Sequence, residues 1–226
     1  MQNERKVLVS AVLRLENDGY SNLILDSLLK NSELNGSQKA FVTAAFYGVV
    51  ERKITIDFIL NKYLKKPIKK APPITSAVLR SGAYQILFMD KVPNSAAVNE
   101  AVKIIKKSKE KGNAPLVNAV LRKLCDETVK SQISNNENPS VKFSVKEWIY
   151  NCLCCDYSKE KAEQFLENSL SSPPVYIRIN HLKENAEDAF ANKDPRLWGT
   201  VIYPGAIFKG SPVVLQAGQK YFENGE

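Results

Sequence analysis

The stretch that decides the fold is residues 74–105, which read ITSAVLRSGAYQILFMDKVPNSAAVNEAVKII. Apolar residues recur every three to four positions up to Phe88 and again from Val98, which is the period of an amphipathic helix. Between these runs, residues 89–94 hold a proline and an asparagine and predict a turn. Ser95 then stands where a helix N-cap belongs. The stretch therefore predicts two helices joined by a short turn.

The same helical period continues on both sides of this pair. Further apolar stripes run through residues 7–15, 23–29, 41–49, 56–64 and 116–124. Ser37 is placed to cap the third helix and Asn113 the last one, with Pro115 in its first turn. Gly48 lies on an apolar face, where it allows another helix to approach closely. Residues 1–130 show no alternating strand pattern, so we predict an all-helical bundle there.

The pattern changes beyond residue 130. Residues 131–141 include the polar run SQISNNENPS and predict a linker. Residues 142–226 predict a small, incomplete α+β segment. It opens with a capping box formed by Ser144 and Glu147 and has two helices up to about residue 170. β-like runs at 175–180, 201–203 and 213–215 follow, with a short helix at 186–191. The chain as a whole is expected to be mainly α-helical.

Composition indicates a globular protein with an uneven charge. Hydrophobic residues make up 44% of the 226 residues. No apolar run approaches the ~20 residues that span a bilayer, and the first residues lack the apolar core of a secretory signal. We therefore expect a cytoplasmic protein with no membrane partner. Residues 1–130 carry 22 basic and 12 acidic side chains, whereas residues 131–226 carry 10 and 12. This asymmetry indicates a polyanion partner for the first part, with a merely soluble basic surface as the alternative.

Few residues are suited to catalysis. The sequence has no glycine-rich loop for a nucleotide cofactor, and its single histidine, His181, argues against metal hydrolysis or a Ser-His-Asp site. Cys152 and Cys155 form a C-x-x-C motif, but no second pair of ligands follows, and a zinc site needs four. We expect buried thiols on an apolar helix face, and we assign no catalytic, cofactor-binding or metal-binding residue.

Two lysine clusters stand out at the ends of predicted helices. The first holds Lys62, Lys65, Lys66, Lys69 and Lys70, and the second holds Lys103, Lys106, Lys107, Lys109 and Lys111. Arg5, Lys6 and Arg14 add a basic strip on the first helix. A lysine near a helix C-terminus also complements the helix dipole by ~0.3–1 kcal/mol, which is the structural alternative for each one. Two compact runs exceed that need and predict contact with RNA phosphates. Because aromatic residues are not interleaved with these lysines, we expect a folded RNA backbone as the ligand more than stacked single-stranded bases.

Polar residues also interrupt strongly apolar helices. They are Arg80, Asn99, Glu100, Asn118 and Arg122. We interpret them as a buried hydrogen-bond network that fixes the register of the helices. Direct contact with RNA is the alternative.

Several stretches together resemble the NusB-type helical domain. They are residues 80–93, 95–102 and 117–122, and the upstream run 41–49 followed by Asp57. The resemblance covers about the first 128 residues. It implies an all-helical RNA-binding domain over this part of the chain.

The continuation is similar to the region that follows this domain in the RsmB (Sun or Fmu) family of 16S rRNA cytosine 5-methyltransferases. The similarity is carried by Trp148, by PVYIRIN at 174–180 and by YFENG at 221–225. The family usually has a proline before the tryptophan, where this chain has Lys146 and Glu147.

The resemblance implies that the chain is the substrate-recognition part of an rRNA methyltransferase, with small-subunit ribosomal RNA as its partner. It extends the RNA-binding role to Arg178 and Asn180. S-adenosylmethionine and the catalytic cysteines belong to a further domain that these residues do not include. No cofactor or catalytic residue is therefore carried over, and the chain alone is expected to be inactive. The alternatives are a stand-alone NusB-like protein in transcription antitermination, which has no use for residues 142–226, and a truncated product without activity.

Overall fold

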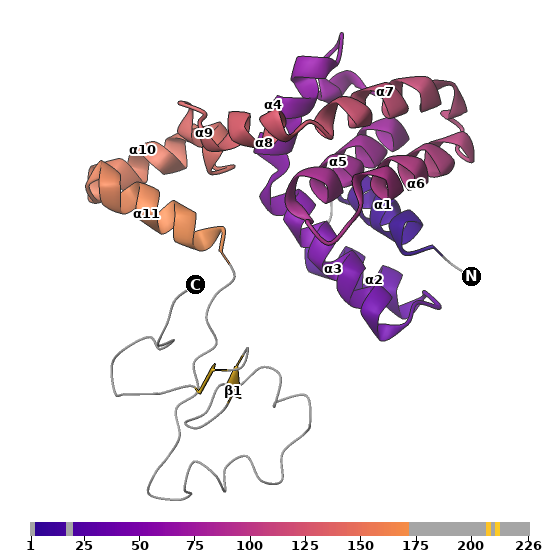
Figure 1. The fold of residues 1–226 in the computed structure, drawn as a ribbon, viewed down its shortest axis with the longest axis horizontal. Coiled ribbons are helices and arrows are strands. Elements are labelled where there is room, and N and C mark those ends of the chain that lie inside the picture. Colours follow the sequence, from indigo (N-terminus) through magenta and orange to yellow (C-terminus); the bar gives the residue numbers. More distant parts are fainter. Residues whose placement is uncertain (1–2, 17–19, 172–206, 209–210, 213–226) are drawn as a thin grey trace, which may run out of the picture. The chain divides into compact units, whose positions relative to one another are not determined.

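The computed structural model describes residues 3–16, 20–171, 207–208 and 211–212, and the chain divides into two compact units, Met1–Glu167 and Asn168–Glu226. Helices make up most of the described residues (Figure 1), so the prediction of a mainly α-helical chain is confirmed. None of the described helices is long and apolar enough to cross a membrane. The predicted strands at 175–180, 201–203 and 213–215, the helix at 186–191 and His181 lie outside the described residues.

The helices of the predicted bundle follow one another in the expected order. They are α1 (Glu4–Leu15), α2 (Ser21–Lys30), α3 (Gly36–Glu51), α4 (Lys53–Tyr63), α5 (Pro73–Phe88), α6 (Asn94–Lys106) and α7 (Ala114–Leu124). Two short 3-10 helices, η1 (Ile68–Lys70) and η2 (Lys111–Asn113), precede α5 and α7. The later helices are α8 (Glu127–Ser134), α9 (Pro139–Lys142), α10 (Glu147–Asp156) and α11 (Lys159–Ser169). An antiparallel pair, β1 (Ile207–Phe208) and β2 (Ser211–Pro212), follows them.

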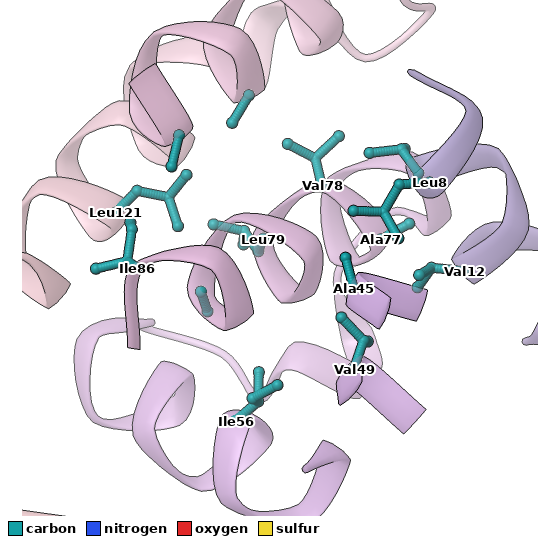
Figure 2. Packing of buried hydrophobic residues seen from close by; sticks show 14 of the residues in the cluster. Leu8, Val12, Ala45, Val49, Ile56, Ala77, Val78, Leu79, Ile86 and Leu121 are labelled. Atoms are coloured by element: carbon teal, nitrogen blue, oxygen red, sulfur yellow. The ribbon is translucent and has the colours of Figure 1, made fainter. Parts of the chain in front are cut away.

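Helix α5 is the centre of the bundle, and α1, α3, α4, α6 and α7 all pack against it (Figure 1). Twelve of its 16 residues are buried. Figure 2 shows Val78 and Leu79 of α5 among apolar side chains from α1, α3, α4 and α7. The sequence explains this burial, because α5 carries a single charged residue, Arg80, and has no charged face to turn toward solvent.

Two glycines let neighbouring helices come close at α5. A Cβ added to Gly48 of α3 would overlap the ring of Tyr84, and one added to Gly82 of α5 would lie 2.7 Å from a methyl group of Leu121. Gly48 thereby leaves room for Tyr84, whose ring packs on Phe88 with the ring centres 5.5 Å apart. The prediction that Gly48 permits a close approach of another helix is confirmed.

Two helices begin at residues other than those predicted. Asn35, not Ser37, caps α3, and it forms a complete capping box with Gln38. Helix α6 begins at Asn94, so Ser95 lies inside its first turn and does not cap it. At the start of α3, Asn35 and Ser37 are both suitable N-caps, and the structure uses Asn35. At the start of α6, Pro93 holds the N-cap position and no side chain caps the helix.

Residues 131–141, predicted to be a linker, are largely helical, because the end of α8 and most of α9 fall within them. Val129 and Ile133 lie one turn apart on α8 and are both buried. Val141 of α9 is also buried, and its carbonyl oxygen accepts a hydrogen bond of 2.6 Å from the hydroxyl of Thr55 in α4. The linker prediction is corrected here, since the polar run hid an apolar pair at helical spacing.

Helix α10 buries none of its residues. Cys152 and Cys155 are exposed, so the expectation of buried thiols is wrong for this helix. The capping box predicted for Ser144 and Glu147 is not formed, because the N-cap position of α10 is taken by Lys146. Within the residues that the structure describes, no group of three His, Cys, Asp or Glu side chains is placed to hold a metal ion.

Candidate nucleic-acid interface

A groove of about 510 Å³ lies between α1 and α6. Among the described residues, three ammonium groups line it, from Lys6 of α1, Lys103 of α6 and Lys107 just beyond α6. All three side chains are exposed. Folding thus brings one residue of the predicted basic strip, Lys6, to the same groove as Lys103 and Lys107 of the second lysine cluster. A phosphate group that enters the groove meets several cations that act together.

The floor of the groove is apolar. Val9 and Leu13 of α1 supply one part of it, and Ile104 of α6 and Ile74 of α5 supply the rest. An apolar floor beside ammonium groups suits a nucleotide, because the base and ribose present apolar faces while the phosphate is anionic. The volume is also that of an ordinary small-ligand pocket, about 300–1,000 Å³.

The carboxylate of Glu100 orders the donors of this groove. Its Oε1 accepts a hydrogen bond from Lys103 Nζ at 2.7 Å, and its Oε2 accepts one from Asn3 Nδ2 at 2.7 Å. The bond from Lys103 is the main cause that lowers the pKa of Glu100, and the bond from Asn3 adds to it against the raising effect of burial. Glu100 therefore stays ionised and holds both Lys103 and the start of α1 in place.

The lysine-rich turn after α6 is anchored by Glu110. Its carboxylate accepts hydrogen bonds from the backbone N–H groups of Ile74 at 3.1 Å and Thr75 at 2.6 Å, and from the Thr75 hydroxyl at 2.6 Å. A carboxylate at this position satisfies free donors of the first turn of α5 and complements its dipole. Asn113 holds the N-cap position of α7, as predicted, but its side chain makes no cap hydrogen bond and donates its Nδ2 to the Thr75 hydroxyl at 2.9 Å. These contacts fix the turn that follows Lys107 beside the floor of the groove.

The other residues predicted to bind RNA take different places. Arg14 on α1 and Lys106 on α6 are exposed but do not line the groove. The four lysines between α4 and α5 are exposed as well, namely Lys65, Lys66, Lys69 and Lys70. Arg178 and Asn180 lie outside the described residues.

Arg5 makes contacts within the protein. Its Nε donates a hydrogen bond of 2.9 Å to Gln85 Oε1 of α5, and its Nη1 lies 3.0 Å from a carboxylate oxygen of Glu4. Its guanidinium carbon lies 5.3 Å from the centre of the Phe41 ring in α3. These contacts join α1 to α3 and α5. They leave the next residue, Lys6, as the α1 cation that lines the groove.

Of the five residues in the predicted polar network, Arg80 alone is buried. Its Nε and Nη2 donate to the two carboxylate oxygens of Asp57 at 2.6 and 2.9 Å, and its Nη1 pairs with Glu16. Burial lowers the pKa of Arg80 to about 10. Burial also raises the pKa of Asp57 to about 6, against the nearby positive charges of Lys53 and Lys69. One guanidinium thus joins α1, α4 and α5, through partners that the prediction did not include.

The remaining four residues do not join this ion-pair cluster. Glu100 lines the groove, and Asn99 is exposed on α6. Arg122 is exposed on α7, and its Nε donates to Asn118 Oδ1 of the same helix at 3.2 Å. The single buried network is therefore corrected to one buried cluster around Arg80 and separate pairs near the surface. Helical spacing places Asn99 and Arg122 on the solvent faces of their helices.

Comparisons with known proteins agree with the helical fold and extend beyond the bundle. The NusB family matches residues 2–126. The probable ribosomal RNA small subunit methyltransferase B of Bacillus subtilis (strain 168) is 31% identical over an alignment of 230 residues, which covers 98% of this chain and 51% of that protein. The protein of the same name from Synechocystis is 31% identical over 170 residues, 74% of this chain and 38% of that protein. The chain thus spans about half the length, or less, of these relatives.

Proteins of the NusB type match a shorter part of the chain. The transcription antitermination protein NusB of Campylobacter jejuni is 28% identical over 118 residues, 52% of this chain and 89% of that protein. The solved structure of T. maritima NusB has a TM-score of 0.52 at 22% identity and covers 56% of this chain and 94% of that one. The crystal structure of PH0851 has a TM-score of 0.61 at 16% identity, covering 84% of this chain and 44% of that one. At these identities, the two structures show a shared fold.

Proposed function

The chain belongs to the NusB family, and from this premise we propose that it is the RNA-binding, substrate-recognition portion of a small-subunit rRNA cytosine 5-methyltransferase. The methyltransferase B relatives support this reading, because the Bacillus subtilis protein is similar over 98% of the chain, including the helices beyond the NusB match. The groove between α1 and α6 supports it as well, since it gathers cations around an apolar floor.

In this role the chain binds RNA and positions it. Lys6, Lys103 and Lys107 neutralise phosphates and release the counterions condensed on them, which favours binding at low salt. The apolar floor receives the face of a base or ribose. The target cytosine is then presented to a catalytic domain, which the remaining length of such enzymes would supply. A cytoplasmic location belongs to the same proposal.

S-adenosylmethionine is the methyl donor that the proposal implies for the catalytic domain. The α1–α6 groove does not fit this molecule, because the three ammonium groups that line it would repel a sulfonium cation. Among the described lining residues, the carboxylate that could offset them, Glu100, already accepts hydrogen bonds from Lys103 and Asn3. No step of methyl transfer is therefore assigned to the described residues. We expect the purified chain to bind RNA without methylating it.

The proposal depends mainly on one observation: Lys6 of α1 lines the same groove as Lys103 and Lys107, which are distant from it in the sequence. We expect the triple variant Lys6→Gln/Lys103→Gln/Lys107→Gln to bind a small-subunit rRNA fragment about ten- to hundredfold more weakly at moderate salt. The slope of log affinity against log salt concentration should become shallower by about 2–3. Fluorescence anisotropy at several salt concentrations measures both quantities.

A matched control removes the same charge elsewhere. Lys30, Lys91 and Lys161 are exposed and lie outside the lining of the groove. Their triple replacement by Gln should change the RNA affinity by less than about threefold, since net charge alone acts weakly at moderate salt. An equal loss in both triple variants, or no loss in either, would contradict the assignment of this groove.

A stand-alone NusB-like protein acting in transcription antitermination is the second candidate function. The match to the Campylobacter jejuni protein, over 89% of its length, favours it. Helices α8 to α11 lie beyond the NusB match and favour the first candidate. Competition at one salt concentration between a small-subunit rRNA fragment and an antitermination leader RNA of equal length distinguishes them. A clear preference for the leader RNA would support the second candidate.

A further inference from the structure

A second groove, of about 590 Å³, lies between α4 and α8. Lys62 of α4 lines one side, and its Nζ donates a hydrogen bond of 3.1 Å to Gln132 Oε1 on the other. Five hydroxyl or amide side chains from α8 and its C-terminal end complete most of the lining, namely Thr128, Ser131, Gln132, Asn135 and Asn136. Helix α8 begins at Glu127, directly after the NusB match ends. The groove is therefore lined in part by an element that lies beyond the NusB match.

The chemistry of this groove differs from that of the first. Among the described residues, every side chain that lines it ends in a polar group, whereas Val9 and Leu13 form an apolar floor between α1 and α6. Ammonium, hydroxyl and amide groups are the side-chain groups that contact phosphates and riboses. The α4–α8 groove can therefore hold a nucleic-acid backbone. None of its described lining residues is an aliphatic or aromatic residue of the kind on which an unpaired base would stack.

Lysines lie over two aromatic rings of α4. Lys62 Nζ lies 4.8 Å from the centre of the Phe58 ring, and Lys123 Nζ lies 5.8 Å from the centre of the Tyr63 ring. A cation over a ring face occupies the surface on which a base would stack. With a lysine over it, neither of these two rings is a bare aromatic anchor of the kind on which protein interfaces depend. Both effects favour a backbone ligand.

Positive charge continues from this groove along the chain. Lys65 and Lys66 follow directly after α4, and both are exposed. Among the described lining residues, Glu137 is the one carboxylate. The charges of Lys62 and Glu137 cancel within the described lining, so the positive charge that favours an anionic ligand is that of Lys65 and Lys66 after α4.

We propose that the α4–α8 groove is a second RNA contact, which holds the sugar-phosphate backbone of a duplex while the α1–α6 groove takes an unpaired nucleotide. This inference rests on the proposed function. Proteins recognise RNA helices mainly through phosphates and 2′-hydroxyls, and both are ligands for the side chains of the α4–α8 groove. The substrate class that fits both grooves is an RNA stem with an adjoining single strand.

The test uses the full chain with two RNAs of equal length, a hairpin with a single-stranded tail and an unstructured single strand. The double variant Lys62→Gln/Lys66→Gln should bind the hairpin about tenfold more weakly, with a salt slope shallower by about 2, and the single strand within about twofold of the unaltered chain. The double variant Lys103→Gln/Lys107→Gln should lose affinity for both RNAs. The Glu137→Gln variant should bind the hairpin about threefold more tightly, because it removes from the groove a negative charge that repels the RNA phosphates.

The outcomes separate this inference from the proposed function. Lys62 and Lys66 are exposed, so their variant is expected to fold, and thermal melting by circular dichroism checks this. Unchanged hairpin affinity in this variant, with a loss in the Lys103/Lys107 variant, would overturn the second contact and leave the proposed function in place. Equal loss for the hairpin and the single strand would overturn the preference for a duplex.

Two further results would also be decisive. If the unaltered chain binds neither RNA in a salt-dependent way, the proposed function itself fails. Poly-glutamate serves as a probe for an acidic protein segment. If the Lys62/Lys66 variant loses poly-glutamate binding but keeps its hairpin affinity, the groove binds an acidic protein segment, and the RNA assignment is overturned.

Discussion

Helices α5 and α10 are both rich in apolar residues, yet the protein uses them in opposite ways. Twelve of the 16 residues of α5 are buried, whereas α10 buries none of its ten. Helix α5 lies within the NusB match and is surrounded by other helices, while α10 lies beyond that match. An apolar period therefore predicts that a helix forms, but only the elements around the helix determine whether it becomes part of a core.

The largest effect is expected from the one charge that α5 buries. Arg80→Met removes the guanidinium that pairs with Asp57 and Glu16 and leaves two carboxylates without their partner. Removing one member of a buried ion pair costs about 3–5 kcal/mol, so we expect the free energy of unfolding to fall by that amount. Urea denaturation followed by circular dichroism measures the change. A loss below about 1 kcal/mol would mean that the burial of α5 does not depend on this ion-pair cluster.

The same variant should show a defined dependence on pH. Burial raises the pKa of Asp57 to about 6, whereas an unfolded aspartate titrates at about 3.9. Between these values the folded state binds the proton more tightly, so stability from this group rises as the pH falls from 7 to 4. Without Arg80 the folded pKa rises further, and Arg80→Met should recover part of its lost stability by pH 5. The control Arg80→Met/Asp57→Asn lacks this carboxyl group and should show a smaller recovery, because Glu16 is then the one carboxylate left without its Arg80 partner.

A medium effect is expected where α3 approaches α5. Gly48→Ala places a methyl group on the ring of Tyr84, which must move away from Phe88. Overpacking of this kind costs about 1–3 kcal/mol, which thermal or urea unfolding measures. Gly36→Ala is the control, because nothing lies within 4 Å of the added Cβ there. Equal effects of the two substitutions would show that helix propensity, not the close approach, determines the result.

A smaller effect is expected at the start of α5. Glu110→Ala removes a carboxylate that accepts two backbone hydrogen bonds, from Ile74 and Thr75. The loss of such a cap costs about 0.5–2 kcal/mol of unfolding free energy. Glu127→Ala, an exposed acidic residue in the first turn of α8, should cost less than about 0.5 kcal/mol. If the two substitutions cost the same, the start of α5 is no better anchored than that of a peripheral helix.

The helices could be predicted from the sequence because an apolar period is a local property. Residues 74–105 predict two helices and a turn, and the structure has α5 and α6 there. The N-cap residues were harder to predict than the helices. Asn35 and Ser37 are both suitable N-caps for α3, and their neighbours in the sequence do not distinguish them. The linker prediction failed for a related reason. The polar composition of residues 131–141 predicted a linker although Ile133 is apolar. The burial of Ile133 depends on elements that are distant in the sequence.

The candidate groove could be predicted only in part. The spacing of Lys103 and Lys107 in the sequence already groups them, but nothing local brings Lys6 to them. The hydrogen bond that joins the two sides of the groove links Asn3 to Glu100, residues 97 positions apart. Such a partner is determined by the way the helices pack, which the period of a single sequence does not encode.

The role of Glu110 was missed for the same reason. Between Lys109 and Lys111 it resembles an ordinary surface charge. The groups it caps, on Ile74 and Thr75, lie 36 and 35 positions away. The missing cap at the start of α5 was a possible signal, because Pro72 provides no side-chain hydrogen bond there and the free donors need a partner from elsewhere.

The smallest effect is expected on α10. Trp148 is 67% exposed, so Trp148→Ser should change the free energy of unfolding by less than about 0.5 kcal/mol. Leu121→Ala on α7, at a residue that is 0% exposed, should cost about 2–5 kcal/mol although leucine is the smaller side chain. Urea denaturation of both variants measures the contrast. If Trp148→Ser costs more than about 1 kcal/mol, α10 is packed in solution much as α5 is, and the difference between the two helices disappears. If it does not, the apolar area of a side chain stabilises this protein only where other helices remove it from water.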